Sequence, residues 1–67
     1  MRLTERQADV VRLVARGMSN QEIAERLHLA ATTVKGYVSD VPAQHQLRDR
    51  VQLVVLAYES GLVRTGR

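Results

Sequence analysis

The chain has 67 residues, no cysteine, and ten Lys or Arg against seven Asp or Glu, which gives a net charge of +3. A chain this short forms a single domain (residues 1–67) that buries only roughly 60% of its unfolded surface, with no disulfide or thiolate metal site to strengthen it. The positive charge favours a polyanionic partner, and the absence of Phe and Trp argues against a surface that stacks single-stranded bases.

Several functional classes find no support in the sequence. No apolar run approaches the roughly 20 residues of a membrane span, and no signal-peptide pattern is present. We therefore expect a cytoplasmic protein with no membrane partner. His28 and His45 are far apart in sequence, and no glycine-rich phosphate loop or nucleophile–base pair occurs, so we expect no enzyme, no metal site and no cofactor.

Capping boxes predict where the first two helices begin. Thr4 is followed three residues later by Gln7, and Ser19 in the same way by Glu22. Apolar residues then recur at helical spacing, and Gly17 is a natural stop between the two segments. These signals predict helices over residues 5–16 and 20–27.

The third predicted helix has an apolar stripe at i, i+3, i+4 and i+7, formed by Val34, Tyr37, Val38 and Val41. The next position on that stripe is His45, but Pro42 comes first. A proline has no N–H to donate to the carbonyl four residues earlier, and its ring crowds that carbonyl. We therefore expect a helix over residues 31–41 that ends or kinks near Pro42. The alternative is a new turn that starts just before Pro42.

The fourth predicted helix, over residues 50–60, begins after Asp49 as a cap and ends before Gly61. It is apolar on nearly every side, and its second apolar face consists of Val51, Val55 and Tyr58. Two interpretations of that face remain. It is either a dimer interface with a second copy of the chain or the exposed apolar surface that any very small domain retains.

A short helix, a three-residue turn and a longer helix form a helix-turn-helix. The predicted fold is therefore all-α, a four-helix bundle that contains a helix-turn-helix. In this motif the second helix presents short polar and cationic groups to the major groove of DNA. The residues predicted to be exposed in this way are Thr32, Thr33, Lys35, Gly36 and Ser39.

Two stretches, "LTERQADVVRLVARGMSNQEIAERLHLAATTVKGYVS" and "LRDRVQLVVLAYESGLV", resemble the DNA-binding domain of LuxR/NarL/FixJ-type bacterial transcription regulators. The resemblance rests on L-T-x-R, then G-x-S-N-x-E-I-A-x-x-L, then T-V-K, and a later R-x-R. It implies sequence-specific binding of double-stranded DNA, with the third helix in the major groove, as the output domain of a response regulator. It also implies a receiver or ligand-sensing domain in the full-length protein, and a homodimer through the last helix.

The resemblance also suggests roles for individual residues. It implies that Lys35 is a principal DNA contact, that Ser39 faces a base, and that Thr33 contacts phosphate. Tyr37 replaces the usual histidine, and Arg50 is expected to be mainly structural. Together with the exposed positions above, the predicted DNA-binding residues are Thr32, Thr33, Lys35, Gly36, Tyr37, Ser39 and Arg48.

The chain departs from the family pattern at several places. Ala30 replaces the Ser or Thr that caps the third helix, a loss of about 1 kcal/mol, and Gln7 replaces a Glu. The main departure is "DVPAQHQ", residues 40–46, hereafter the atypical segment. In it, Gln44 replaces a Lys, His45 a core Leu, and Gln46 a turn Gly or Asn.

The atypical segment leaves two hypotheses open. An interior proline costs about 3 kcal/mol and a polar residue in place of a core leucine about 2–4 kcal/mol, against a total stability of about 5–15 kcal/mol. Asp40 also cancels the charge of Lys35. Either the domain binds DNA through a kinked third helix with weakened affinity, or it is a dimerisation or protein-interaction module on the same scaffold.

Overall fold

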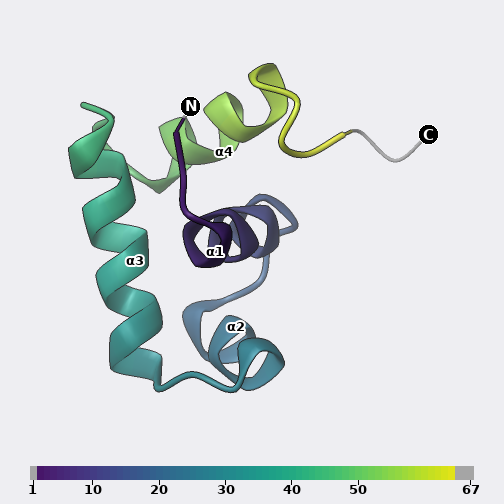
Figure 1. Ribbon diagram of the computed structural model, residues 1–67, viewed down its shortest axis with the longest axis vertical. Helices are drawn as coiled ribbons and strands as arrows, with labels where there is room; N and C mark the ends of the chain where they lie inside the picture. The colour runs from purple at the N-terminus through teal and green to yellow at the C-terminus, as the bar shows by residue number, and fades with distance from the viewer. Residues whose placement is uncertain (1, 65–67) are drawn as a thin grey trace.

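A computed structural model describes residues 2–64, which form four helices and no strand: α1 (Glu5–Ala15), α2 (Asn20–Leu27), α3 (Ala31–Gln44) and α4 (Arg50–Glu59). The predicted all-α bundle with a helix-turn-helix is therefore confirmed. α1 packs against each of the other three helices. Figure 1 shows α3 along one side of the molecule, with α2 and α4 near its opposite ends.

The predicted capping boxes are present at the starts of α1 and α2. The amide N–H of Gln7 donates to the Thr4 hydroxyl at 3.1 Å, and that of Glu22 donates to the Ser19 hydroxyl at 3.1 Å. α2 has the predicted bounds, while α1 and α4 each end one residue before the prediction. Helix starts in this chain are thus set by local side-chain chemistry that the sequence displays.

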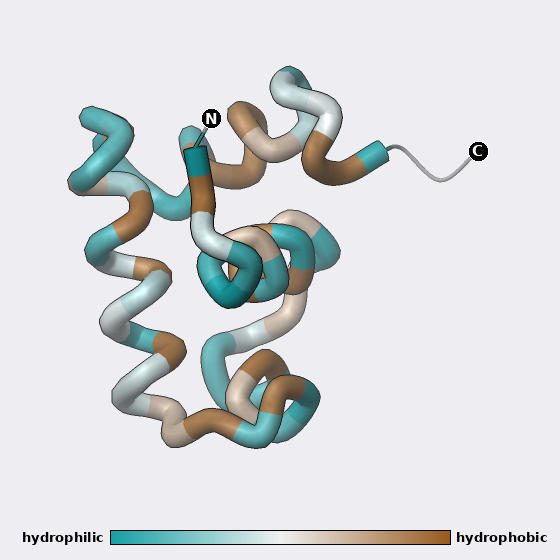
Figure 2. Tube along the Cα trace, viewed as in Figure 1, coloured by the Kyte–Doolittle hydropathy of each residue, from teal (hydrophilic) through white to brown (hydrophobic). Residues whose placement is uncertain are grey.

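The core is aliphatic and draws on every helix. On α3, Val34 and Val41 are completely buried, and Tyr37 and Val38 are half-buried beside them. The apolar residues of α3 lie on the side turned towards α1, and its other side is mostly polar (Figure 2). The buried core consists of Val10, Val11, Leu13, Val14, Ile23, Ala24, Val34, Val41, Leu53, Ala57 and Val63.

The sequence predicted a third helix over residues 31–41 that ends or kinks near Pro42, but the helix does not end there and continues through Pro42 to Gln44. The proline removes only one donor from the last turn, and its ring is buried. Two later amides close the helix beyond it: the N–H of Leu47 donates to the Pro42 carbonyl at 2.8 Å, and that of Gln46 to the Ala43 carbonyl at 3.2 Å. This pattern is a Schellman motif, with Gln46 left-handed at φ 59°.

His45 does not take the core position predicted for it. Its ring is half-buried, and both ring nitrogens lie near backbone carbonyl oxygens. Among residues 2–64, no buried side-chain nitrogen or oxygen lacks a hydrogen-bond partner. The loss of stability expected for a polar residue at position 45 therefore does not come from an unpaired buried group.

Within the part of the chain that the structure describes, no helix has the length and apolar character that crossing a membrane requires.

Candidate nucleic-acid interface

The turn between α2 and α3 sets the angle between the two helices of the motif. His28 has left-handed backbone geometry at φ 57°, and the N–H of Leu29 donates back to the Ala24 carbonyl at 2.9 Å. Ala24 is only 6% exposed, and α2 packs against α3. A small residue at this position allows the helices to approach closely, and the turn then directs α3 away from α2.

The first turn of α3 has no side-chain cap. Ala30 occupies the capping position and makes no side-chain hydrogen bond. The N–H groups of Thr33 and Val34 donate to the Ala30 carbonyl at 3.0 and 3.1 Å, which leaves the amides at the very start of α3 without a helical acceptor. These amides, with the positive end of the helix dipole, are suited to an anionic group that approaches from outside.

Six of the seven predicted DNA-binding residues lie on α3. Thr32, Thr33, Lys35 and Ser39 are exposed, while Gly36 and Tyr37 are half-buried. The seventh, Arg48, is exposed in the connection between α3 and α4, and its backbone N–H donates to the Gln52 side-chain oxygen. The structure therefore gathers six of these residues on one helix and places Arg48 beyond the C-terminal end of that helix.

Gly36 is not required by the packing of the domain. A Cβ atom added at this position would meet no heavy atom within 4 Å. A glycine inside a helix lowers stability by roughly 0.5–1 kcal/mol relative to alanine. A methyl group at position 36 would therefore extend from α3 without touching the rest of the domain.

The charged groups near α3 have distinct roles. Lys35 and Asp40 are both exposed on the helix, and no ion pair within residues 2–64 involves either of them. Arg50 faces inward instead: its guanidinium donates to the Asn20 side-chain oxygen at 2.8 Å and to the Met18 carbonyl at 2.7 Å. This confirms the structural role expected for Arg50, because these bonds join the start of α4 to the turn between α1 and α2.

The arginines of α1 are partly engaged with a carboxylate. Asp9 lies 3.7 Å from Arg6 and 3.4 Å from Arg12, and all three side chains are close to half-exposed. Ion pairs this exposed contribute little to stability. They do reduce the positive charge that this helix offers to a polyanion.

The capping box of α2 lowers the pKa of the Glu22 carboxyl group. The backbone N–H of Ser19 donates to the Glu22 carboxylate at 2.8 Å, and this bond, followed by one from the Ser19 hydroxyl, lowers the pKa of Glu22 below its usual 4.5. The ionised form is favoured because it accepts these donors. The charge therefore strengthens the capping box that begins α2.

The apolar face predicted on α4 is exposed. Val51 is 69% exposed, Val55 49% and Tyr58 39%, and the three follow one another at helical spacing. The Tyr58 hydroxyl donates to the Ala15 carbonyl at 3.4 Å, so this ring is partly held against α1. The face is therefore not covered by the domain itself.

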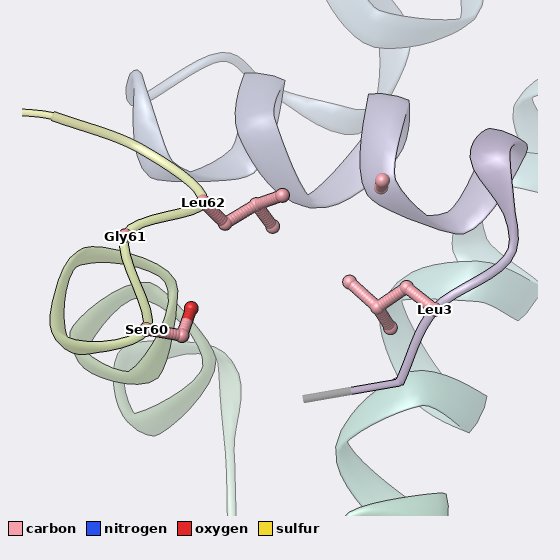
Figure 3. Close-up of a pocket in the computed structure, with 5 residues that line it drawn as sticks. Leu3, Ser60, Gly61 and Leu62 are labelled. Atoms are coloured by element: carbon pink, nitrogen blue, oxygen red, sulfur yellow. The ribbon is translucent and has the colours of Figure 1, made fainter.

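A shallow pocket lies where the N-terminal segment approaches the turn after α4 (Figure 3). Leu3 and Leu62 extend into it, and the Ser60 hydroxyl is its main polar side-chain group. Titratable side chains do not line it, and residues 2–64 hold no cluster of three His, Asp or Glu side chains placed for a metal ion. The pocket offers no group for acid–base chemistry.

Sequence reasoning missed one polar cluster, made by Gln7, Gln44 and His45. The Gln7 side-chain amide donates to the Gln44 side-chain oxygen at 3.4 Å, although the residues are 37 positions apart. Both are sites where the chain departs from the family pattern. Paired departures, an amide for a Glu and an amide for a Lys, were the only signal in the sequence that the two positions are neighbours.

The comparisons with known proteins agree with this geometry. The family described as "Bacterial regulatory proteins, luxR family" matches residues 1–57. Response regulator protein VraR from Staphylococcus aureus (strain Mu3) is 41% identical over 61 residues, which cover 91% of this chain and 29% of that protein. VraR from Staphylococcus epidermidis shows the same identity and coverage, so the chain spans less than a third of these relatives. On the extent of the family match, the chain belongs to the luxR family of bacterial regulatory proteins.

Proposed function

We propose that this chain binds double-stranded DNA in a sequence-specific manner, as the output domain of a bacterial transcription regulator, with α3 in the major groove. The observation that supports this most directly is the exposed side of α3, where the side chains of Thr32, Lys35 and Ser39 make no hydrogen bond within residues 2–64. An α-helix with short polar and cationic side chains fits the width of the major groove. The membership of the luxR family and the response-regulator relatives support the same function.

Each residue on this surface has a role in the proposed complex. Lys35 donates to a base edge or phosphate, and Ser39, one turn later, faces the bases. Thr33 and the free amides at the start of α3 bind a phosphate, and Tyr37 can donate its hydroxyl to the backbone. Arg48 contacts the backbone from beyond the end of the helix. The role is binding, without a catalytic group or cofactor.

The wider setting follows from the relatives. Because the chain spans 29% of the VraR proteins, and these are named response regulators, we infer that the full-length protein also contains a receiver or ligand-sensing domain. A DNA-binding output domain works where bacterial DNA lies, so the proposed location is the cytoplasm. The regulated genes and the signal depend on that additional domain and on the operator.

Binding to labelled duplexes tests this proposal. Duplexes selected from a random pool are titrated with the protein at several salt concentrations, and affinity should fall steeply as salt rises. Lys35→Ala should lower affinity by about 1–3 kcal/mol if Lys35 contacts a base, and lower the salt slope by about 0.9. Arg16→Ala removes the same charge from exposed surface on the C-terminal side of α1 and is the matched control. No duplex binding at low salt would reject the proposal.

A second proposal concerns the exposed face of α4. We infer that Val51, Val55 and Tyr58 form a homodimer contact, because an uncovered apolar face on a helix is a self-complementary surface for a second copy. If so, sedimentation should show a dimer that Val55→Asp converts to monomer. A wild-type protein that is strictly monomeric on and off DNA would exclude this interface. Dimerisation with no duplex binding would instead favour a protein-interaction module on the same scaffold.

A further inference from the structure

The N-terminal segment is fastened to the C-terminal end of α3 by the ring of His45. Its Nδ1 lies 2.9 Å from the Val41 carbonyl oxygen, and its Nε2 lies 3.1 Å from the Arg2 carbonyl oxygen. A neutral imidazole has one N–H and donates to one of these oxygens, whereas an imidazolium donates to both. The ring therefore lies between two backbone carbonyls that are about 40 residues apart in sequence, and with a proton on Nε2 it donates to the Arg2 carbonyl.

Gln7 makes a second link between the same regions. Its side-chain oxygen accepts the Thr4 N–H at 3.0 Å, and its side-chain nitrogen donates to the Gln44 oxygen at 3.4 Å. An amide can do both, whereas a carboxylate can only accept. Gln7 thus ties the capping residue of α1 to the last residue of α3. We call Gln7, Gln44 and His45 the clasp.

The C-terminal end of α3 is closed by the Schellman motif and by the burial of Val41 and Pro42, but it lacks several other stabilising features. Pro42 withholds the N–H that would bond the carbonyl one turn earlier, and Gln46 is held in a left-handed conformation that a side chain disfavours. No basic residue in the last turn offsets the negative end of the helix dipole. Contacts from outside the helix consequently matter more here than at the end of α1, where the left-handed position is filled by Gly17.

We propose that the clasp positions α3 for DNA: His45, with Gln44 and Gln7, fixes the C-terminal end of the helix against the N-terminal segment and thereby sets the angle of its exposed face. These residues are positioning residues, since none lies in the proposed contact surface. The inference rests on the proposed function. The segment from Arg2 to Thr4, hereafter the strap, then holds the C-terminal end of α3. Displacing the strap would release that end.

Two variants of His45 separate hydrogen bonding from packing. His45→Leu fills similar space without a donor, and His45→Gln retains a side-chain N–H. Duplex affinity is measured together with heteronuclear NOE values for the Leu3 and Thr4 amides. His45→Leu should stay folded, lower the NOE values of the strap, and weaken duplex binding about fivefold. His45→Gln should restore most of both.

Each contrary result is informative. Equal duplex affinity of wild type and His45→Leu would overturn the positioning role, even if the strap became mobile. An equal loss in both variants would show that ring packing, and not hydrogen bonding, holds the helix. If the wild type binds no duplex, the proposed function fails and the positioning role fails with it, while the NOE comparison still decides whether the clasp holds the strap.

Discussion

The two halves of α3 are attached to the molecule in different ways. From Ala31 to Ser39 the polar side chains make no hydrogen bond to other residues within the described part of the chain, and most are exposed. From Asp40 to the turn at Gln46, Val41 and Pro42 are buried, Gln44 accepts a hydrogen bond from Gln7 on α1, and the His45 ring lies against the Arg2 carbonyl. One continuous helix thus keeps its first half available to a partner and uses its second half for internal contacts.

This contrast accounts for the departures from the family pattern. Apart from Ala30, which replaces a cap, and Tyr37, which replaces a histidine, the first half keeps residues that the resemblance associates with DNA, among them Thr33, Lys35 and Ser39. The atypical segment occupies the second half, where neighbours within the domain, and not a partner, decide what fits. Changes there alter how α3 is held more than what it presents.

Beyond the helix, Arg48 is exposed and Arg50 bonds to other parts of the domain. Replacing Arg50 should have the largest effect on stability. Arg50→Ala removes two charged hydrogen bonds, at 2.8 and 2.7 Å, and should lower the free energy of unfolding by about 2–3 kcal/mol. Arg48→Ala is the matched variant and should leave stability within about 0.5 kcal/mol, because Arg48 is exposed. Urea denaturation measures both. Equal losses of stability would contradict the division into an inward and an outward arginine.

Replacement of Pro42 tests whether the second half still contains strain. Pro42→Ala restores the N–H for the Val38 carbonyl, and we expect unfolding to become harder by about 1–2 kcal/mol, less than the full penalty of an interior proline because the buried ring packing is lost. Pro42→Gly restores the N–H without alanine's helix propensity and should gain less. A lower melting temperature for Pro42→Ala would show that the ring contributes more than the missing hydrogen bond costs.

A side-chain cap added at the start of α3 tests how far the first half of the helix depends on its own end. Ala30→Ser should stabilise the domain by about 1 kcal/mol, since the serine oxygen can accept an amide N–H of the first turn. Ala30→Val adds bulk without a good cap and serves as the control. Thermal unfolding of the two variants would show a gain confined to serine. No gain would mean that water already satisfies those amides.

Substitution in the turn that follows α3 should change stability by a smaller amount. Gln46 has φ 59° in the position where a Schellman motif usually has glycine. Gln46→Gly should therefore raise stability by about 0.5–1 kcal/mol, while Gln46→Ala should not. Chemical denaturation at constant salt measures the difference. Equal stability of the glycine and alanine variants would argue that this turn is not under strain.

The smallest expected effect is a loss of stability in acid, when Glu22 in the capping box of α2 becomes protonated. Because the pKa of Glu22 is lowered in the folded protein, its contribution is present above its usual pKa of 4.5 and is lost as the pH falls through the lowered value. Glu22→Gln retains the capping box without titration. Its stability should fall less steeply than that of the wild type below this pH. Parallel curves would show that the Glu22 charge is not coupled to folding.

The sequence predicted what depends on neighbouring residues. The Ser19–Glu22 capping box and the helical spacing predicted both bounds of α2, and the Ala30 start of α3 was correctly predicted to lack a cap. The predicted end of α3 at Val41 was wrong. The rule that proline ends a helix takes no account of the burial of Pro42 or of the turn that the Leu47 N–H closes. The contacts from His45 to Arg2 and from Gln44 to Gln7 could not be predicted, since local periodicity carries no information about residues 37 or more positions apart. The DNA contacts themselves remain predictions.

In the proposed DNA complex, the open space beside Gly36 would let the target sequence change while the fold stays the same. A Cβ atom at this site touches nothing inside the domain, so variants with small side chains here would differ mainly in what they offer to the proposed DNA partner. Under the proposed function, a single small substitution here would change the preferred operator without a compensating mutation in the core. Position 36 is therefore a starting point for redesigning the target sequence of the proposed complex.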